Sequence, residues 1–283
     1  TDNLVEYPCI PVSISQQYVD YVVKVEKIGI PEKIGAGATR MTNNPRDLMI
    51  AKRVADVIAS SRMFMDGFSF QTGAGTISIA CTNYLAQHME KRNIKASFAL
   101  GGMTANIVDM FNKGLVRVLL CSQSFDSIAA RAIAEHQNII EIDNAVYSNK
   151  FSKGCMLDKL NFGVLAGLEI DVDFNLNILT GSNGSMMGGL GGGPDVAEGA
   201  DISIVTLPII RGRTPSVVKK VFTVCTPGET VAMVVTEAGI ALNPRHKHYK
   251  MLREDLEKSG FKIVSIEWLC QLAESMTGIP KPI

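Results

Sequence analysis

Hydrophobic positions in the first half of the chain follow two alternating spacings. In residues 43–61, apolar side chains recur at helical intervals behind Asn44, which can cap a helix, and Pro45, which suits its first turn. Similar helices are expected after Gly75 and over 104–114 and 124–136. Short apolar stretches between them predict strands, at 66–75, 96–102, 115–122 and 138–143. Strands that are apolar on both faces, separated by amphipathic helices, indicate an α/β fold. We expect a mainly parallel open sheet with flanking helices.

The pattern changes from about Gly154. Four β-rich stretches joined by turns are expected over 162–179, 201–210, 217–227 and 230–239. Two late helices, 247–260 and 266–278, flank a last strand at 261–266. No internal repeat or low-complexity linker interrupts the chain, so residues 1–283 are predicted to form a single domain with 1–45 as an entry segment. Because residue 1 is not methionine, we expect a processed chain or a piece of a longer one.

The composition limits the classes of partner that the protein can bind. The 28 basic and 28 acidic side chains cancel, which argues against nucleic acid or an anionic membrane as the main partner. No apolar run reaches the roughly 20 residues that a transmembrane helix needs. Six scattered cysteines without a C-x-x-C pair favour reduced thiols in a cytoplasmic protein. The four histidines do not cluster with them, so no metal site is expected.

Three glycine segments are candidate ligand sites. Gly73 and Gly75 follow the first predicted strand, Gly101 and Gly102 end the second, and five glycines fall within residues 188–193. None completes a dinucleotide fingerprint or a phosphate loop, and Asp195 follows the long run where a pyrophosphate would be repelled. Bare N–H groups without a fixed cation suit an acyl oxygen that becomes anionic only in the transition state. The alternative is that these glycines serve tight turns and close packing.

Polar side chains at strand ends are the other candidates, because ligands of open α/β sheets bind beyond the carboxyl ends of the strands. Gln71 and Thr72 precede the first glycine turn and can donate to a substrate oxygen. Asp143 and Asn144 terminate the strand of 138–143, where a ligand-facing side chain or a helix cap is expected. Glu237 ends an apolar strand, where it can orient a loop amide, act on protons or serve a structural hydrogen bond.

Long motifs carry a family resemblance. They are GSNGSMMGGLGGGPDVAEGADISIVTLPIIRGRTPSVVKK, VVTEAGIALNPR, MDGFSFQTGAGTISIA and EIDNAVYSNKF. Together they resemble the carboxyl-terminal half of the citrate lyase alpha chain family over nearly all 283 residues, which implies one half of a two-domain alpha chain. More distantly, the order of motifs is similar to the CoA-transferase superfamily. That similarity implies a NagB/RpiA/CoA-transferase-like fold.

The resemblance also implies an activity. Members of the family are transferases of a cytoplasmic bacterial complex. They exchange the acetyl group of an acetyl-acyl carrier for citrate, giving citryl-acyl carrier and acetate. The implied partners are the beta (lyase) and gamma (acyl carrier) subunits in an oligomer. No cofactor is expected to be bound covalently to this chain, which would act on the carrier's dephospho-CoA-type group or on CoA thioesters.

One departure from the superfamily is informative. Its covalent members carry a glutamate about where this chain has Gly101 and Gly102, and glycine cannot attack an acyl group. The sequence therefore favours transfer through a non-covalent ternary complex. Gly101, Gly102, Gly192, Gly193 and Glu237 are the expected catalytic positions.

The expected substrate-binding residues come from all of these segments. Citrate carries three carboxylates, so Arg211 and Arg213 near the glycine run are candidates for ion pairing, with Arg40 as another. The full expected set is Gln71, Thr72, Gly73, Gly75, Asp143, Asn144, Asp195, Arg211 and Arg213. Two alternatives stay open: a CoA transferase for another carboxylic acid, and a non-catalytic scaffold half of the complex.

Overall fold

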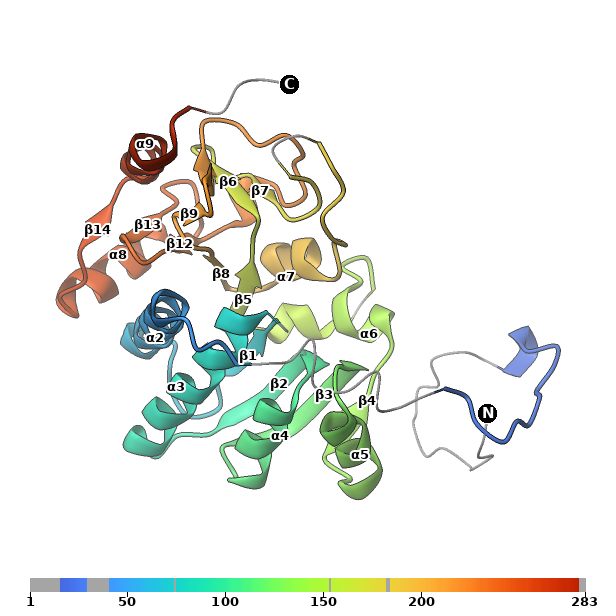
Figure 1. Cartoon of the computed structure of the whole chain (residues 1–283). Coiled ribbons are helices and arrows are strands. Elements are labelled where there is room, and N and C mark those ends of the chain that lie inside the picture. Colours follow the sequence, from blue (N-terminus) through green and yellow to red (C-terminus); the bar gives the residue numbers. More distant parts are fainter. Residues whose placement is uncertain (1–15, 30–40, 74, 153, 182–183, 280–283) are drawn as a thin grey trace.

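The computed structural model describes residues 16–29, 41–73, 75–152, 154–181 and 184–279 (Figure 1). Arg40 and Cys9 lie outside these residues, as does much of the expected entry segment. The part of that segment at 16–29 contains a short 3-10 helix, η1 (Gln16–Tyr18), and every residue in it is exposed.

A nine-stranded sheet forms the centre of the molecule, and it is parallel at every pairing except β12 with β13. The prediction of a mainly parallel open sheet is therefore confirmed. From one edge to the other the strands are β14 (Ile263–Val264), β13 (Ile240–Leu242), β12 (Met233–Val235), β8 (Ile202–Thr206), β5 (Phe162–Ala166), β1 (Ser69–Thr72), β2 (Ala96–Met103), β3 (Val116–Ser124) and β4 (Ile139–Glu141).

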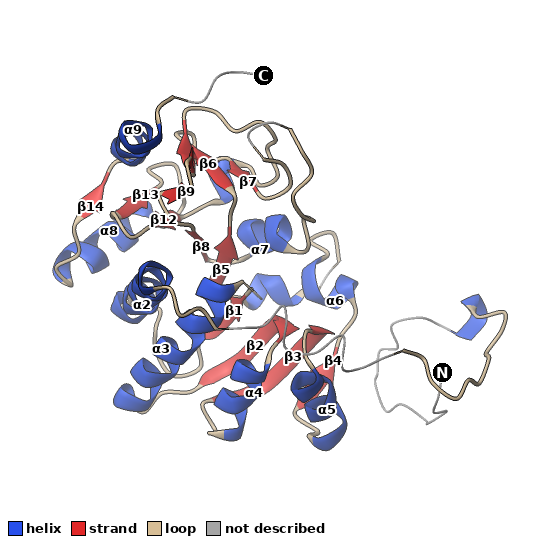
Figure 2. Ribbon diagram, in the orientation of Figure 1, coloured by secondary structure: helices blue, strands red, loops and turns tan. Residues whose placement is uncertain are grey.

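Helices cover both faces of this sheet (Figure 2). Side chains of one buried cluster come from α2 (Pro45–Ser60), α3 (Thr76–Arg92), α4 (Ala105–Asn112), α5 (Ser127–Glu135) and α8 (Tyr249–Lys258). The cluster on the opposite face draws on α6 (Asn144–Ser148), α7 (Gly193–Gly199), α9 (Ile266–Thr277) and the 3-10 helix η2 (Met156–Lys159). Neighbouring positions in β2 alternate between the two, since Ala99 joins the first cluster and Leu100 the second.

Two small sheets lie beside the second cluster. One pairs β6 (Glu169–Asp171) with β7 (Leu176–Asn177) and β11 (Val217–Val218), and the other pairs β9 (Ile210–Arg211) with β10 (Thr214–Pro215). The predicted β-rich stretch at 217–227 is a strand only at its start. Beyond it, the amide of Val221 donates to a carboxylate oxygen of the buried Asp171 instead of to a neighbouring strand, and the 3-10 helix η3 (Gly228–Thr230) follows.

The strand order reverses at β1 and β5. From β1 the chain adds β2, β3 and β4 outward on one side, whereas β5, β8 and β12 extend the sheet on the other side. Connections therefore leave the carboxyl ends of β1 and β5 in opposite directions and leave a crevice between them. This reversal places the functional site.

Candidate functional site

A cavity of about 810 Å³ lies at this reversal of strand order. Its wall includes the carboxyl ends of β1, β2, β3 and β5, helix α6 and the glycine loop that leads into α7. In Figure 1 these elements meet where the lower half of the sheet joins the upper half. The glycine segments singled out in the sequence, which are far apart along the chain, thus contribute to one site.

Most of the expected site residues line this cavity. The lining residues among them are Gln71, Thr72, Gly73, Gly102, Asn144, Gly192, Gly193, Asp195 and Arg211. Of the described side chains in the lining, Asp195 is the one that carries a negative charge and Arg211 the one that carries a positive charge. The site is otherwise made of backbone, hydroxyls, amides and apolar groups.

The remaining expected residues lie outside the lining. Gly75 precedes α3 as its N-cap, and the carboxylate of Asp143 caps α6 by accepting from the amide of Val146 at 2.8 Å. Arg213 stands on the turn between β9 and β10, exposed to solvent. Glu237 accepts a hydrogen bond from the amide of Ile209 at 2.9 Å, so its carboxylate holds the loop before β9.

Gly101 borders the cavity in a conformation that only glycine adopts easily. Its φ is +99°, and β2 shifts register against β3 between Gly101 and Gly102. A Cβ at Gly101 would lie 3.1 Å from Cγ of Gln71 and 3.2 Å from the hydroxyl oxygen of Tyr147. Two side chains already occupy the space that a larger residue at this position would need.

Gly102 makes room for a neighbour of another kind. A Cβ at this position would come within 1.9 Å of the ring of Phe125, which itself lines the cavity. A ring atom cannot be approached so closely, so any larger residue would displace Phe125. Gly102 therefore lets an aromatic wall close against β2.

The long glycine run presents unpaired backbone to the cavity. Within the described residues, the amides of Gly188, Gly189, Gly191 and Gly192 donate no hydrogen bond to the chain. The amide of Gly193 begins α7, where the first N–H groups of a helix have no partner in their own helix. Gly189, Gly191, Gly192 and Gly193 all line the cavity, so a ligand there meets donors that no other group of the described chain engages.

The start of this run is anchored by Asn177, a fully buried residue at the end of β7. Its side-chain oxygen accepts from the amides of Leu179 and Thr180, at 3.1 and 3.0 Å. Its amide group donates to a carboxylate oxygen of Glu169 and to the carbonyl of Thr180. One side chain thus fixes the point from which the glycine loop departs.

Several cavity residues escaped the sequence analysis. Among those with polar side chains are Tyr147 on α6, Gln123 on β3 and Thr226. Burial, aided by the negative charge of Asp195, raises the pKa of Tyr147 to about 12, so its hydroxyl stays protonated. Tyr147 lies within the quoted stretch EIDNAVYSNKF, but its spacing in α6 reads equally well as that of a packed aromatic side chain.

Two buried polar atoms in the wall lack partners. The side-chain oxygen of Gln71 and the hydroxyl of Thr226 form no hydrogen bond, although Gln71 is only 7% exposed and Thr226 not at all. Leaving such groups unpaired costs about 1–3 kcal/mol each. A site that binds a polar ligand recovers this cost when the ligand arrives.

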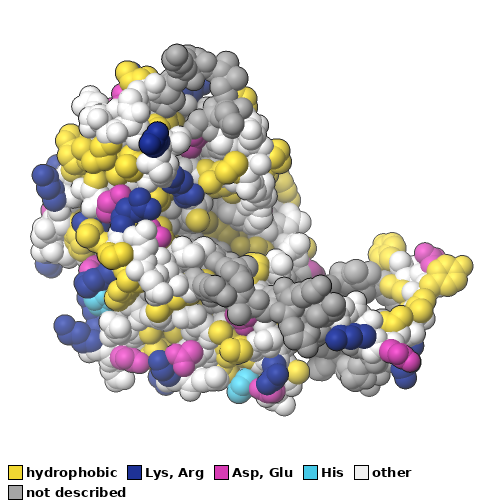
Figure 3. All heavy atoms as spheres, viewed as in Figure 1, with side chains coloured by type: hydrophobic (Ala, Val, Ile, Leu, Met, Phe, Trp, Pro, Cys, Tyr) yellow, Lys and Arg dark blue, Asp and Glu magenta, His cyan; other side chains and the backbone are white. Residues whose placement is uncertain are grey.

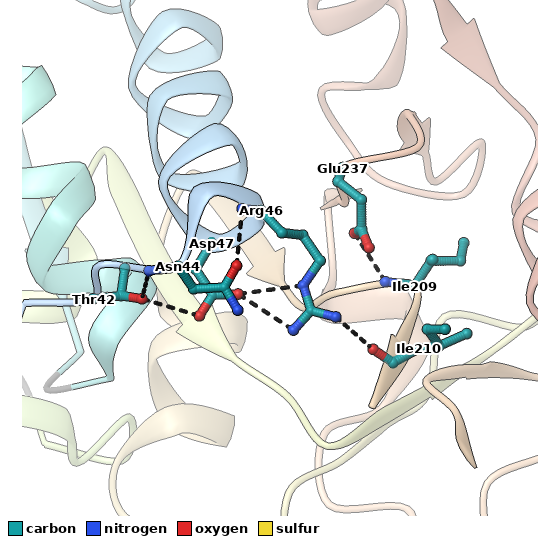
Figure 4. A network of polar contacts seen from close by, with 7 residues as sticks. All are labelled: Thr42, Asn44, Arg46, Asp47, Ile209, Ile210 and Glu237. Atoms are coloured by element: carbon teal, nitrogen blue, oxygen red, sulfur yellow. Dashed lines mark hydrogen bonds and ion pairs between the residues drawn. The ribbon is translucent and has the colours of Figure 1, made fainter. Parts of the chain in front are cut away.

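Arg211, the cation of the cavity, follows a segment that is held by a network of polar contacts (Figure 4). Arg46, in the first turn of α2, donates to the carbonyl of Ile210 at 3.1 Å and contacts Asp47, while Glu237 holds the amide of Ile209. The segment 209–211 is thereby fixed from both sides. Arg211 in turn donates to the carbonyl of Gly167 at the end of β5.

Arg46 also changes the electrostatics of Arg211. Desolvation of the Arg211 guanidinium, together with the nearby positive charge of Arg46, lowers its pKa. Two neighbouring guanidinium groups favour an anion. The arrangement suits a carboxylate ligand at this end of the cavity.

Basic and acidic side chains intermix over the face seen in Figure 3 and form no patch of one sign. In the described part of the chain no three His, Cys, Asp or Glu side chains gather as metal ligands would, and no helix has both the length and the apolar character of a membrane span. The five cysteines within these residues are free.

Comparison with known proteins places the chain in a family. The family model for the alpha subunit of citrate lyase matches residues 1–283. The citrate lyase alpha chain of Escherichia coli (strain K12) is 50% identical over all 283 residues, and that of Klebsiella pneumoniae is 47% identical. The chain covers 55% of each, so it spans about half the length of these relatives.

Solved structures agree with this assignment. A citrate lyase alpha subunit from Streptococcus mutans, in complex with citrate, superimposes with a TM-score of 0.92 at 44% identity, over all of this chain and 55% of that one. RipA from Yersinia pestis (TM-score 0.56, 16% identity, 78% of this chain and 55% of that one) shares the fold. So does the malonate decarboxylase alpha subunit of Acinetobacter baumannii (0.61, 14%, 95% and 59%).

Proposed function

The chain belongs to the citrate lyase alpha subunit family, and from that premise we propose that its cavity exchanges acyl groups between carboxylates on a thioester. The acetyl group of an acetyl-acyl carrier is replaced by citrate, which gives citryl-acyl carrier and acetate. The thioester belongs to a dephospho-CoA-type group of the carrier, or to CoA itself. The partners are the beta and gamma subunits of a citrate lyase complex, in an oligomer in the bacterial cytoplasm.

The reaction needs no acyl group on the protein. A citrate carboxylate oxygen attacks the acetyl carbonyl carbon, the carbon–sulfur bond breaks, and the thiolate leaves, which forms a mixed anhydride of acetate and citrate. The same thiolate then attacks the citryl carbonyl of the anhydride. The carbon–oxygen bond breaks and acetate departs. Both acyl partners stay in one ternary complex, so positioning and oxyanion stabilisation carry the catalysis.

The observation that carries this proposal is the crowding at Gly101. The covalent superfamily members hold their glutamate near this position, but here a Cβ would already meet Gln71 and Tyr147 within 3.2 Å. A side chain at this position would have to adopt the positive φ of Gly101 and would press on both neighbours. The described wall contains one carboxylate, Asp195, in the first turn of α7.

The positions of the residues around the cavity suggest a role for each of them. The amides of Gly192 and Gly193, with the backbone at Gly101 and Gly102, surround the acyl carbon. Gln71, Thr72 and Gly73 approach the thioester from β1, and Asn144 and Asp195 from the opposite wall. Arg211 pairs with a citrate carboxylate, as its position between the carbonyl of Gly167 and Arg46 favours. Citrate is the ligand named for the Streptococcus mutans relative.

Glu237 has an indirect part in this scheme. Its contact with the Ile209 amide holds the segment that carries Arg211, so its removal should weaken citrate binding and not the chemical step. Gly75, Asp143 and Arg213 stand outside the lining and have supporting roles in helix starts and a turn.

The test uses a full-length alpha subunit that contains this segment. The protein is mixed with acetyl-CoA, or acetyl-acyl carrier, and each of several acids, and the acyl thioesters formed are identified by mass spectrometry. We expect citryl thioester with citrate and none with succinate or butyrate. Products from the other acids would support a CoA transferase of different specificity. No product from any acid would support a scaffold role.

A further inference from the structure

Tyr147 occupies the junction of the two glycine segments. Its hydroxyl oxygen lies 3.2 Å from the place of a Cβ on Gly101 and 2.9 Å from that of a Cβ on Gly192. The first glycine lies near the end of β2, and the second precedes α7, 91 residues further along the chain. Helix α6, which carries Tyr147, packs against both β3 and α7 (Figure 1). Both glycines therefore leave room for the same hydroxyl.

The hydroxyl has no partner within the described chain. Tyr147 is only 7% exposed and lines the cavity, and its oxygen takes part in no hydrogen bond with the described residues. The oxygen is not sealed inside the protein, so a ligand in the cavity can become the partner that a tyrosine O–H normally finds. Gln71 borders the same glycine, since its Cγ lies 3.1 Å from the place of a Cβ on Gly101, and its buried side-chain oxygen is unpaired as well.

The phenol is a donor at every working pH. Burial raises its pKa to about 12, and the negative charge of Asp195 acts in the same direction. A neutral phenol can offer its proton to an oxygen that gains negative charge. It cannot serve as a general base near neutrality.

We infer that the Tyr147 hydroxyl is a catalytic residue that donates a hydrogen bond to the acyl oxygen during exchange. The inference rests on the proposed function and adds a side-chain donor to the glycine amides. The oxygen becomes anionic when the attacking carboxylate or thiolate adds to the carbonyl carbon, and it loses that charge when the leaving group departs. The proton stays on Tyr147 throughout, so no proton transfer needs balancing.

Tyr147→Phe in the full-length subunit tests this assignment. Phenylalanine keeps the packing of the ring and removes only the donor. We expect kcat for citryl thioester formation to fall about 100-fold, with KM for citrate and the melting temperature nearly unchanged. Tyr84→Phe, which removes a hydroxyl from the side of α3, is the matched control and should keep wild-type rates.

A second variant tests the geometry without touching the tyrosine. Alanine fits the backbone of Gly192 (φ −84°), but its Cβ would press on the Tyr147 ring and hydroxyl at 2.8 and 2.9 Å. Gly192→Ala should therefore lower kcat. The loss from Gly192→Ala should largely vanish when Tyr147 is already phenylalanine.

The outcomes separate this inference from the proposed function. A wild-type subunit that forms no citryl thioester would overturn both. An active wild type with an equally active Tyr147→Phe variant would overturn only the role of Tyr147. So would a variant whose whole defect is a raised KM for citrate, because the hydroxyl would then bind the ground state.

Discussion

At the scale of single residues, Arg211 and Arg213 stand two positions apart on one hairpin, but only Arg211 lines the cavity. We predict that Arg211→Ala raises KM for citrate by about 10- to 100-fold, the value of a charge-assisted hydrogen bond. Arg211→Lys should recover part of the loss, since it keeps the charge without the planar fork. Steady-state kinetics of the full-length subunit measure both.

Arg213→Ala is the internal control for this prediction. It removes the same charge from the same hairpin, where both arginines are exposed, but from outside the lining of the cavity. KM for citrate should therefore change less than about twofold, as for other exposed charges. Equal losses in the two alanine variants would mean that the hairpin acts through its overall charge. The pairing of Arg211 with a citrate carboxylate would then be wrong.

The residues that the sequence analysis missed were missed for one physical reason. Gln71, Asn144 and Arg211 were found because strand ends and turns near glycine are recognisable locally. Tyr147 and Asn177 are important because of contacts that form only in the folded protein. Tyr147 lies beside two glycines from distant parts of the chain, and Asn177 accepts hydrogen bonds from two loop amides. No local pattern distinguishes such residues from ordinary packed ones.

At the scale of elements, the glycine loop depends on its anchor. Asn177→Ala removes the acceptor of two loop amides and leaves Glu169 without one of its donors. We predict a loss of about 2–3 kcal/mol in the free energy of unfolding, measured by urea denaturation. The rate of citrate exchange should fall as well, because the amides of the loop lose their fixed position.

A neighbouring asparagine separates stability from function. Asn175 donates to Asp171 and accepts from the amide of Gly228, on the turn between β6 and β7. Asn175→Ala should lower stability by a similar amount and leave the exchange rate of the folded protein unchanged. If both variants slowed exchange alike, the anchoring role of Asn177 would be refuted.

Elements were predictable where local signals are strong. Asn44 caps α2 and Pro45 is its first residue, as expected. The strands and helices of residues 66–143 also lie close to their predicted places. Helix α7 was not predicted, since its first turn contains Gly193 and Pro194. It is held by the burial of Val196 and Ala197 against the sheet, a tertiary effect that overrides local propensity.

At the scale of the whole molecule, one buried histidine should make stability depend on pH. His246 is 7% exposed, and its Nδ1 accepts from the amide of His248, which requires a neutral ring. Burial, then the charges of His248 and Lys247, lower its pKa to about 4. An unfolded histidine titrates near 6.5, so the unfolded chain binds the extra proton between these values.

Because the unfolded chain binds the extra proton, lowering the pH favours unfolding. The contribution of His246 to the free energy of unfolding is complete above about pH 6.5 and is lost as the pH falls towards 4, by up to about 3 kcal/mol. Denaturation at a series of pH values should reveal this fall in the wild type, and a smaller one in His246→Gln. His136→Gln, at the end of α5, should keep the wild-type dependence. An unchanged slope in His246→Gln would contradict the account.

The reversal of strand order organises the molecule as a whole. It gathers glycine segments from β1, β2 and the loop before α7 around one cavity, a convergence that follows from parallel topology and that strand-end reasoning anticipated. The chain spans about half of its relatives' length, so full-length protein is the right material for every kinetic test.

The most direct test of the central claim follows the mass of the intact protein through a single turnover. Full-length subunit is mixed with isotopically labelled acetyl thioester, with and without citrate, and quenched at intervals for mass spectrometry. We predict no labelled protein at any time, and citryl thioester only when citrate is present. A labelled acyl group on a glutamate, cysteine or Asp195 that appears with acetyl thioester alone and disappears when citrate is added would contradict the account.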